Sequence, residues 1–359
     1  MSKTYKIIEL IGDGISKEIT HEALKLLNVI QKTNPSIKFQ IKQLPIGYTC
    51  YKQYKTPITK EIINQCKNSD GVLLGAVGHP EANKLQSDLR PEKGLLRLRE
   101  GMGLYSNIRP VVVYNNLIDA SPVKSDIIQG TDIVFVRELS AGIYKSECGI
   151  LQADYAEDIM KYSSQEINRI LRYSFKLASQ RKKKLCIVDK SNVLNTSKLW
   201  RTCSYLIKQD FPDVEVEYQY VDAMSYFLVK QPTKYDVIVT ANLFGDILSD
   251  EAAILSSSLG MLPSMSLNDY NCGLYEPVHG SAPDIEGQGI ANPTGTILSL
   301  AMMLRQLSLT DYAKFIEQSI SNVLSRNCFT KDINPSTTQK SLTTSEFGDE
   351  VVNEFIKLI

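Results

Sequence analysis

The sequence predicts an α/β fold with two domains. Segments with the apolar pattern of strands follow one another along the chain, with segments of helical spacing between them. Such alternation is typical of sheets covered by helices on both faces. The chain has 359 residues, of which 43% are hydrophobic and 22% charged, and this is enough for two ordinary globular domains.

Strands are expected where apolar and β-branched residues alternate or run together, and helices where apolar residues recur every three to four positions. The last helical pattern follows Thr344, Ser345 and Glu346, residues typical of a helix start. In chain order, we expect strands at 5–11, 39–44, 71–77, 132–138, 184–190, 214–222 and 235–242, and helices at 15–30, 58–66, 197–207, 223–229, 242–255 and 347–359.

The charge balance argues against nucleic acid or a membrane as the main partner. The 40 basic and 40 acidic residues give a formal net charge of zero. We therefore expect neither nucleic acid nor an anionic membrane as the main partner. The dense basic run at 181–184 lies between a helical pattern and a strand. We expect it to be a solvated helix end.

The lack of a recognisable signal segment and the cysteine usage lead us to expect a cytoplasmic protein. The N-terminus has no apolar signal core, and no apolar stretch reaches the roughly 18 residues that span a bilayer. Seven cysteines without a C-x-x-C pair are expected to be reduced thiols. His21, His79 and His279 lack zinc-ligand spacing, so any metal should be a hard cation bound by carboxylates.

Two aspartates, Asp246 and Asp250, stand four residues apart just after the strand at 235–242. Four residues are about one helical turn, roughly 5.4 Å of rise, so both carboxylates are expected on one helix face, where they repel. The helix dipole favours acidic residues in a first turn, which would explain Asp246. It explains Asp250 less well, because a like charge there needs a positive group nearby. The stretch alone leaves both interpretations open.

Other charged residues end predicted strands. Lys190 and Asp222 end the strands at 184–190 and 214–222. Open α/β sheets build their sites just beyond the carboxyl ends of strands, so these two residues and Asp246 could converge.

Three arginines, Arg99, Arg109 and Arg137, lie among hydrophobic residues. Each alone is expected to be a structural ion-pair partner, whereas the three together with the strand-end acids indicate a polyanionic small substrate held with a cation. Tyr144 follows Arg137 closely and by itself is expected to be an ordinary half-buried tyrosine.

A G-x-G motif follows the first strand, in GDGISK at 12–17, but the Rossmann fingerprint is incomplete. Lys17 takes the place of the third glycine, and the second strand ends in Leu44 and Pro45 without an acid for a ribose hydroxyl. If a nucleotide binds, the Gly- and Pro-rich segment 276–293 is the candidate, since its composition argues against a helix or central strand. An ordinary long loop is the alternative.

Eleven ordered segments carry a resemblance that covers nearly the whole chain: GDGI, VLLGAVGHP, PEKGLLRLRE, NIRP, VRELSAGIY, VDKSNVL, YVDAM, NLFGDILSDEAA, EPVHGSAPDI, GIANP and TSEFGD. Through them the chain resembles the isocitrate/isopropylmalate family of β-decarboxylating dehydrogenases, most closely its isopropylmalate branch. The resemblance implies a two-domain fold distinct from Rossmann. Residues 1–104 and 257–359 would form a large cofactor-binding domain, and residues 105–256 a middle domain that dimerises and carries the metal-binding and catalytic residues.

The activity implied by this resemblance is NAD-dependent oxidation of the C2 hydroxyl of 3-isopropylmalate. Metal-assisted decarboxylation to 2-oxoisocaproate (4-methyl-2-oxopentanoate) would follow, a step of leucine biosynthesis. Sibling enzymes for isocitrate, homoisocitrate, tartrate or other alkylmalates are alternatives, as is, more distantly, a metal-dependent phosphohydrolase. The resemblance further implies a homodimer whose subunits share each active site.

The resemblance also assigns roles to residues. Asp246 and Asp250 would hold Mg²⁺ or Mn²⁺ together with Asp222 of the partner subunit. Tyr144 would protonate the carbanion left by decarboxylation, and Lys190, also contributed by the partner, would help to remove the hydroxyl proton. The substrate would bind through Arg99, Arg109, Arg137, Asp222, Glu92, Leu95 and Leu96. The cofactor would bind through Gly78, His79, Pro80, Glu92, His279, Gly280, Ser281, Ala282, Pro283, Asp284, Ile285 and Asn292.

Cofactor preference is implied by Asp284 and Ile285, which match the adenosine-facing positions of NAD-using members. A carboxylate there accepts hydrogen bonds from ribose hydroxyls and repels a 2′-phosphate, so NAD is expected over NADP. Departures from the usual family pattern border the nicotinamide and the catalytic region, and we expect them to affect rate and fine specificity more than reaction class. They include His79, Ser140, Ala141 and Lys145.

Overall fold

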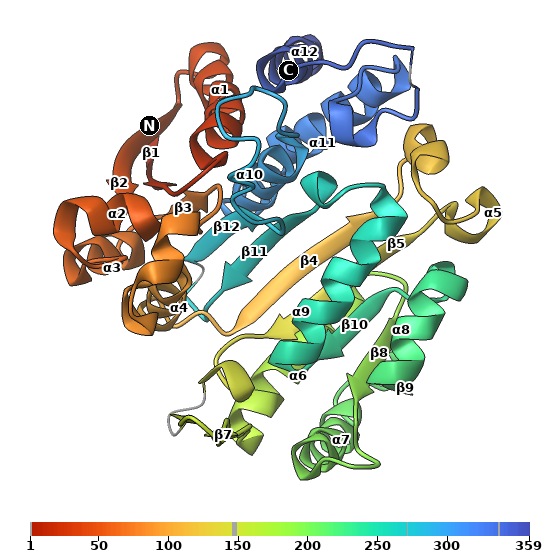
Figure 1. The fold of residues 1–359 in the computed structure, drawn as a ribbon. Helices are drawn as coiled ribbons and strands as arrows, with labels where there is room; N and C mark the ends of the chain where they lie inside the picture. Colours follow the sequence, from red (N-terminus) through yellow and green to blue (C-terminus); the bar gives the residue numbers. More distant parts are fainter. Residues whose placement is uncertain (1, 146–148, 271, 337) are drawn as a thin grey trace. The chain divides into compact units, whose positions relative to one another are not determined.

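The computed structural model describes residues 2–145, 149–270, 272–336 and 338–359. The chain divides into two compact units: unit 1 consists of Met1–Leu104 and Ser257–Ile359, and unit 2 of Tyr105–Ser256. In each unit, helices cover both faces of the strands (Figure 1), which confirms the predicted α/β class.

Unit 1 is built on strands in the order β2-β1-β3-β12-β11. It contains strands β1 (Lys3–Ile11), β2 (Ile37–Pro45), β3 (Gly71–Leu74), β11 (Pro263–Leu267) and β12 (Gly273–Pro277), and helices α1 (Ser16–Thr33), α2 (Gly47–Tyr54), α3 (Lys60–Lys67), α4 (Pro91–Gly101), α10 (Thr294–Gln306), α11 (Thr310–Ser325) and α12 (Thr344–Leu358). β1 runs parallel to β2 and β3, β12 runs parallel to β3, and β11 is antiparallel to β12.

Alternation along β1 directs its side chains to two helical layers. Ile8 and Leu10 join a buried cluster with residues of α2, α3 and α4. Glu9 points to the opposite face, where its carboxylate accepts a hydrogen bond from Thr20 of α1 (2.9 Å). On that face α10 packs against α1 and against β3, β11 and β12. The second half of β1 is therefore buried on both faces, as parallel strands usually are, whereas the edge strand β2 is only partly buried.

Unit 2 has its strands in the order β4-β5-β10-β8-β9, antiparallel between β4 and β5 and parallel between the other neighbours. It contains strands β4 (Ser106–Val112), β5 (Asp132–Glu138), β6 (Ile150–Leu151), β7 (Ala156–Glu157), β8 (Lys184–Asp189), β9 (Glu215–Tyr220) and β10 (Val237–Thr240), and helices α5 (Ser125–Ile128), α6 (Ser164–Ser179), α7 (Asn195–Lys208), α8 (Val221–Lys230) and α9 (Asn242–Glu251). β6 and β7 form a separate two-stranded ribbon.

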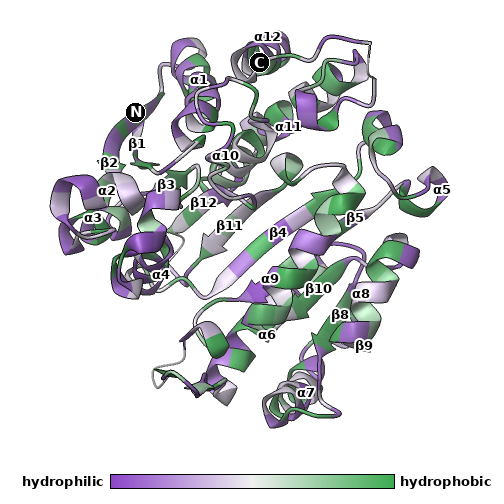
Figure 2. Cartoon of the chain, in the orientation of Figure 1, coloured by the Kyte–Doolittle hydropathy of each residue, from purple (hydrophilic) through white to green (hydrophobic). Residues whose placement is uncertain are grey.

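Adjacent side chains of β5 point to opposite faces of this sheet. Val136 lies in the core cluster with α6 and α7, which includes Phe175 and Trp200. Arg137 points to the other face, against which α9 packs. The approach is close because residue 245 is glycine: a Cβ on Gly245 would lie 2.8 Å from the Cβ of Arg137. In Figure 2, β8 and β10 are hydrophobic along most of their length, as expected of strands buried on both faces.

Several boundaries differ from those predicted, and two of them concern candidate site residues or segments. Asp222 does not end a strand: β9 ends at Tyr220, where its ladder with β8 stops, and Asp222 lies in the first turn of α8. The segment 276–293 is not entirely a loop, because Glu276 and Pro277 belong to β12. Pro277, the last residue of β12, has no amide N–H to donate to the ladder.

The basic run 181–184 is not a simple solvated helix end, which corrects the prediction. α6 ends at Ser179, and Arg181 binds Asp236 (2.7 Å) and Asp132 (2.9 Å). Arg181 therefore ties the starts of β10 and β5 together, because its two partners precede or begin these strands.

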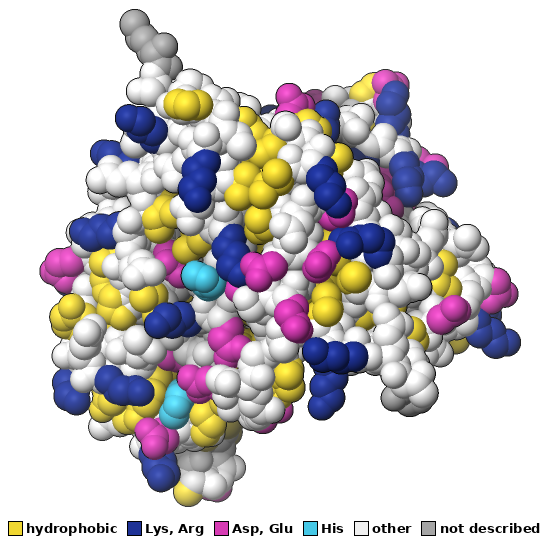
Figure 3. Space-filling model, turned by 90° about the horizontal axis from the view of Figure 1, so that it is seen from above, with side chains coloured by type: hydrophobic (Ala, Val, Ile, Leu, Met, Phe, Trp, Pro, Cys, Tyr) yellow, Lys and Arg dark blue, Asp and Glu magenta, His cyan; other side chains and the backbone are white. Residues whose placement is uncertain are grey.

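Several surface properties accompany this fold. Within the described part of the chain, every helix is too short or too polar to cross a membrane. The cysteines described there are free, and all but Cys328 are buried. Figure 3 shows basic and acidic side chains intermixed over the face seen from above, in keeping with the zero formal charge.

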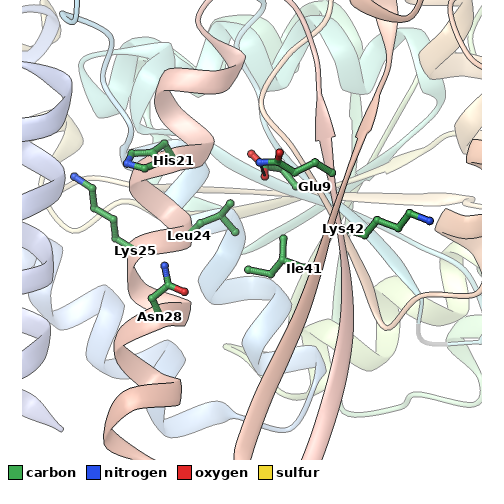
Figure 4. A pocket seen from close by; sticks show the side chains of 8 residues that line it. Glu9, His21, Leu24, Lys25, Asn28, Ile41 and Lys42 are labelled. Carbon is green, nitrogen blue, oxygen red and sulfur yellow. Dashed lines mark hydrogen bonds between the residues drawn. The ribbon is translucent and has the colours of Figure 1, made fainter.

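A groove of about 520 Å³ lies between α1 and the strands β1 and β2 (Figure 4). It is lined by Glu9, whose carboxylate accepts hydrogen bonds from Thr20 (2.9 Å) and Gln43 (2.8 Å). Lys25, also in its lining, binds Asp349 of α12 (2.7 Å). These polar groups are committed to contacts within unit 1, so the groove marks where α1 is joined to its neighbours.

The final helix, α12, begins with a capping box, in which Thr343 and Glu346 each accept a hydrogen bond from the other's backbone amide. We predict that Thr343→Ala lowers the free energy of unfolding by about 1 kcal/mol, because a helix amide loses its partner. Urea unfolding followed by circular dichroism measures the change. The control is Thr310→Ala, at the first position of α11, where no side chain caps the helix. Equal losses in the two variants would contradict the prediction.

Candidate active site

Two arginines meet the aspartates of α9. Arg109 of β4 binds Asp250 (2.8 Å) and Asp246 (3.4 Å), and Arg137 of β5 binds Asp246. In the antiparallel pair β4 and β5, Asn107 lies opposite Arg137, so both arginines point to the same face. The arginine side chains are only 7% and 4% exposed, whereas those of Asp246 and Asp250 are 33% and 53% exposed. Two nearly buried cations thus offset the repulsion between the carboxylates.

This geometry overturns the helix-dipole interpretation of Asp246. The residue lies in the second turn of α9, and the first turn contains no acidic residue. Its carboxylate accepts hydrogen bonds from Arg109, Arg137 and the Tyr144 hydroxyl rather than from helix amides. Burial raises the pKa of Asp250, and so does the charge of Asp246, while Arg109 lowers it. The two carboxylates therefore still compete for positive charge.

Tyr144 lies beside this cluster. Its hydroxyl donates a hydrogen bond to Oδ2 of Asp246 (3.0 Å), and its ring centre lies 5.7 Å from the guanidinium carbon of Arg137. Partial burial raises the pKa of Tyr144, and the negative charge of Asp246 raises it further. The hydroxyl therefore keeps its proton at neutral pH and can act as a proton donor.

Asn242, the first residue of α9, connects the parts of the cluster. Its side-chain oxygen accepts a hydrogen bond from Nε of Arg137 (3.0 Å). Its amide nitrogen donates to the carbonyls of Leu139 (3.3 Å) and Ala141 (3.0 Å), in the loop that leads to Tyr144. The side chain is buried with all of these bonds formed. Asn242 therefore fixes Arg137 and the tyrosine loop relative to the helix of the aspartates.

The loop after β5 is held from its other side by Glu138. This buried carboxylate accepts hydrogen bonds from the amides of Ser140 (2.9 Å) and Ala141 (2.9 Å) and from the Ser140 hydroxyl (2.5 Å). Burial raises the pKa of Glu138 despite these bonds. Arg169 of α6 adds a hydrogen bond to the Ser140 hydroxyl (2.9 Å). Ser140, one of the unusual residues, thus retains a hydroxyl that the loop uses.

Lys190 and Asp222 form a separate pair in unit 2. The Lys190 ammonium lies 2.5 Å from the Asp222 carboxylate, and this hydrogen bond lowers the pKa of Asp222. The Asp222 side chain is 65% exposed. In the part of the chain that the structure describes, no three His, Cys, Asp or Glu side chains are grouped as a metal site. Asp246 and Asp250 are therefore not joined by Asp222 of the same chain.

The turn that carries Lys190 is anchored by its neighbour. The buried carboxylate of Asp189 binds Arg201 of α7 (2.7 Å) and accepts a hydrogen bond from the amide of Ser191 (2.8 Å). The amide of Lys190 itself donates to the Ser197 hydroxyl (3.1 Å). The backbone on both sides of Lys190 is thus fixed, while its ammonium reaches outward.

In unit 1, Arg99 of α4 faces Glu276 of β12. Their side chains form a 2.7 Å ion pair and are only 13% and 8% exposed. The Nε atom of Arg99 is buried without a hydrogen-bond partner among the described residues. Leu95 packs in part against the core of unit 1, and Leu96 is half-buried. Arg99 therefore already holds one carboxylate and has a further donor.

The predicted cofactor residues of unit 1 come together at Gly78. Its φ of +128° lies in a region that favours glycine. A Cβ there would lie 3.2 Å from the Ser281 hydroxyl and 3.5 Å from the Glu92 carboxylate. His79 follows with its ring stacked on Tyr48 (4.4 Å between centres). The segment around Ser281 and the start of α4, which are far from Gly78 in sequence, thus lie next to Gly78.

In the segment after β12, some residues pack against or bond to the rest of unit 1, and others are exposed. Ala282 and Ile285 pack against a small buried cluster of Ile15, Ile19 and Ala291, and Asp284 is exposed. The Nε2 atom of His279 is buried and has no hydrogen-bond partner among the described residues. Asn292 is committed to the protein itself, because its side chain bonds the Thr294 amide and the Asp332 carboxylate (both 3.0 Å). The remaining predicted residues here are Gly280, Ser281 and Pro283.

Comparison with known proteins assigns the family. The model of the isocitrate/isopropylmalate dehydrogenase family matches residues 6–351. The chain belongs to this family. It is 47% identical over 358 residues to a 3-isopropylmalate dehydrogenase of Pseudomonas fluorescens, with 98% of each chain covered. It is 46% identical over 361 residues to the 3-isopropylmalate dehydrogenase of Aquifex aeolicus, with 99% of this chain and 98% of that one covered.

The fold of this dehydrogenase agrees with solved structures of the family. An isocitrate dehydrogenase from Methylococcus capsulatus superposes with a TM-score of 0.85 at 30% identity, covering 98% of this chain and 99% of that one. A β-decarboxylating dehydrogenase from Thermococcus kodakarensis superposes with a TM-score of 0.79 at 31% identity, covering 98% and 96%. The predicted family and its fold are thereby confirmed.

Sequence reasoning missed several residues that support the dehydrogenase's charged side chains. Asn242 and Asp189 were treated only as parts of predicted strands and helices, although a polar residue at a strand end is a signal of its own. Glu276 and Glu138 stand next to apolar runs, and a buried acid requires a partner. The partner of Glu276 is Arg99, which lies far away in the sequence. The partners of Glu138, Ser140 and Ala141, are near neighbours, but their contacts depend on how the loop folds.

We predict that Asn242→Asp lowers kcat about 100-fold, because two loop carbonyls lose their donor and Tyr144 loses its fixed position. The bond from Arg137 survives, so KM for the substrate should change little. Steady-state kinetics on protein shown to be folded by thermal unfolding measures both. Asn195→Asp is the matched control, since Asn195 is likewise the first residue of its helix but is exposed. An unchanged kcat in Asn242→Asp would refute the role of Asn242.

Proposed function

We propose that this dehydrogenase oxidises the C2 hydroxyl of 3-isopropylmalate with NAD and a divalent cation and releases the carboxylate on C3 as CO₂. The products are 4-methyl-2-oxopentanoate, CO₂ and NADH, as in leucine biosynthesis. The observation that carries the proposal is the cluster of two nearly buried arginines, two aspartates and a protonated tyrosine in unit 2. Relatives that are 46% to 47% identical over nearly the whole chain are named 3-isopropylmalate dehydrogenases.

The cluster is suited to a dianionic substrate. Arg109 and Arg137 present planar guanidinium groups, which match carboxylates. They are balanced by the charges of Asp246 and Asp250. A substrate with two carboxylates, bound together with a divalent cation, leaves the total charge of the cluster unchanged. Arg99 of unit 1, with a buried Nε donor beyond its pair with Glu276, is proposed as a further carboxylate-binding residue.

The donor set of α9 fits a hard divalent cation. Asp246 and Asp250 offer carboxylate oxygens from one helix face, and both are exposed enough for water and substrate to complete the coordination. Mg²⁺ or Mn²⁺, when bound, would supply positive charge that stabilises negative charge on the substrate oxygens. We propose Asp222 of the partner subunit as the third carboxylate.

Two side chains are proposed to move protons. Tyr144, whose raised pKa keeps its hydroxyl protonated, donates a proton to C3 once the carboxylate has left. Lys190 helps to remove the proton from the C2 hydroxyl. Its amino group lies 2.5 Å from the carboxylate of Asp222. One proton is removed and one is added, so the reaction releases none overall.

The proposed homodimer has support in exposed apolar side chains of unit 2. They lie on the ribbon of β6 and β7 and around helices α7, α8 and α9, and they include Leu151, Val193, Leu206, Tyr226 and Ile247. Exposed apolar side chains gathered in one unit mark an interaction surface. A second copy would cover them and bring its Lys190 and Asp222 to the aspartates of α9. The free cysteines fit a reducing compartment, and we propose the cytoplasm.

Unit 1 is proposed to bind NAD through the segments at 78–80 and 279–285. The glycines leave the backbone accessible, and the unpartnered Nε2 of His279 can accept a hydrogen bond from the nucleotide. The exposed carboxylate of Asp284 favours NAD over NADP by repelling a 2′-phosphate. NAD, when bound, supplies the acceptor for the hydride from C2.

Purified protein with NAD and Mg²⁺ should reduce NAD with 3-isopropylmalate at a kcat/KM at least about 100-fold higher than with isocitrate. The reason is that Leu95 and Leu96 suit an isopropyl group and not a third carboxylate. NADH absorbance and released CO₂ measure turnover. EDTA should abolish it, and Mn²⁺ should restore it. Faster turnover of isocitrate, or activity that resists EDTA, would sink the proposal.

Complementation between inactive variants tests the shared site. Lys190→Ala and Tyr144→Phe should each be nearly inactive as homodimers. Co-refolded in equal amounts, they should recover roughly a quarter of wild-type activity, because half of the dimers are mixed and each mixed dimer has one intact site of two. Refolding each variant alone is the control. Absence of recovery from mixed dimers would show that one chain builds the whole site.

A further inference from the structure

We propose that the turn Gly12–Ile15 is a clamp on the two cofactor segments, and that Asp13 at its centre sets the affinity for the nicotinamide half of the cofactor. This GDG motif follows β1 and does not complete a Rossmann fingerprint. The inference rests on the proposed use of NAD. It gives the motif a positioning role within unit 1.

Asp13 acts through backbone amides. Its buried carboxylate accepts hydrogen bonds from the amides of Tyr48 (3.0 Å), Thr49 (2.9 Å) and Gly78 (2.9 Å). Tyr48 and Thr49 lie in the first turn of α2, and α2 has no side-chain cap of its own. Asp13 thus caps α2 from a distance and, with the same carboxylate, holds the amide of Gly78.

The glycines on either side allow the turn to touch both segments. A Cβ on Gly12 would lie 1.8 Å from the carbonyl oxygen of Ala76, and a Cβ on Gly14 would lie 2.0 Å from that of Ser281. Gly14 also has a φ of +55°. The amide of Asp13 donates to Ala76 (3.0 Å), and the amide of Ile15 donates to Ser281 (3.0 Å). A side chain at either glycine would push a segment away.

The clamp extends to His79 through Tyr48. The ring of Tyr48 stacks on His79 at 4.4 Å and 14°, and its hydroxyl donates a hydrogen bond to Glu81 (2.6 Å). Nδ1 of His79 accepts from the amide of Glu81 (3.2 Å). His79 stands where the family commonly has glycine, and the aromatic stack gives its larger side chain a fixed place. Asp13 therefore orders 78–80 both directly and through α2.

The two ends of the turn serve different halves of the cofactor. Asp13 holds Gly78, next to His79, which the family resemblance places beside the nicotinamide, whereas Ile15 holds Ser281, near Asp284 and Ile285, which the resemblance places at the adenosine. Asp13→Asn is isosteric, but its amide nitrogen only donates, so with the nitrogen in the position of Oδ2 the side chain accepts from neither Tyr48 nor Gly78. The substitution should release Gly78 and leave the contact of Ile15 with Ser281 in place.

The test compares NAD with ADP-ribose, which lacks the nicotinamide, by titration calorimetry on the full-length protein. In Asp13→Asn, the Kd for NAD should rise about tenfold, while the Kd for ADP-ribose stays within about twofold. Hydrogen exchange of the Gly78 amide should become faster. Tyr48→Leu provides a second variant. It keeps the hydrogen bond from the amide of residue 48 to Asp13 but removes the ring stacked on His79, so the Kd for NAD should rise by a smaller factor.

Asp70→Asn is the matched control, because Asp70 also accepts a backbone amide within unit 1, that of Lys6 (2.6 Å), away from the cofactor segments. It should leave both affinities unchanged. If Asp13→Asn weakened the binding of NAD and of ADP-ribose equally, or weakened neither, the clamp proposal would be wrong, while the proposed function would stand. Wild-type protein that binds neither compound would overturn the proposed function and, with it, the cofactor role given to Asp13.

Discussion

The pairing of two nearly buried arginines with two aspartates on one helix face is the interaction on which the rest of unit 2 depends. A buried guanidinium that loses its counter-charge destabilises a protein by several kcal/mol, roughly 3 to 5. The surrounding structure keeps these charges together. The antiparallel register of β4 and β5 places Arg109 and Arg137 on one face, Gly245 allows α9 to approach Arg137, and Asn242 links that arginine to the loop of Tyr144.

Around Asp13 in unit 1, a buried charge is stabilised by backbone amides and not, within the described residues, by an opposite charge. There the central carboxylate, Asp13, is stabilised by backbone amides, and the neighbouring chain segments approach one another at glycines. Amides and glycines leave a surface of backbone donors with few side chains, which suits a ligand with phosphates and ribose hydroxyls. Unit 2, with its forked cations, suits a small polycarboxylate. The chemical difference between the Asp13 turn of unit 1 and the Arg109–Arg137 cluster of unit 2 therefore follows from whether backbone amides or side chains surround the charges.

The sequence predicted much of this because the informative patterns were local. Strand and helix patterns located most elements, and NLFGDILSD placed Asp246 and Asp250 on one face of a helix. Local patterns failed where distant residues decide the outcome. The helix-dipole interpretation of Asp246 was wrong because Arg109 and Arg137, more than a hundred positions away, take its carboxylate. Asp222 was misplaced because the end of β9 is set by its ladder with β8.

Charge balance also links the proposed ligands of unit 2 to each other. The two arginines and two aspartates are neutral as a group, so a dianionic substrate alone would add two uncompensated negative charges. A divalent cation alone would add two positive ones. Either ligand entering a partly buried cluster without the other meets an electrostatic cost that the second removes, so each should raise the affinity for the other, and by the same factor. An aspartate pair opposed by an arginine pair is therefore a means of admitting cation and substrate together.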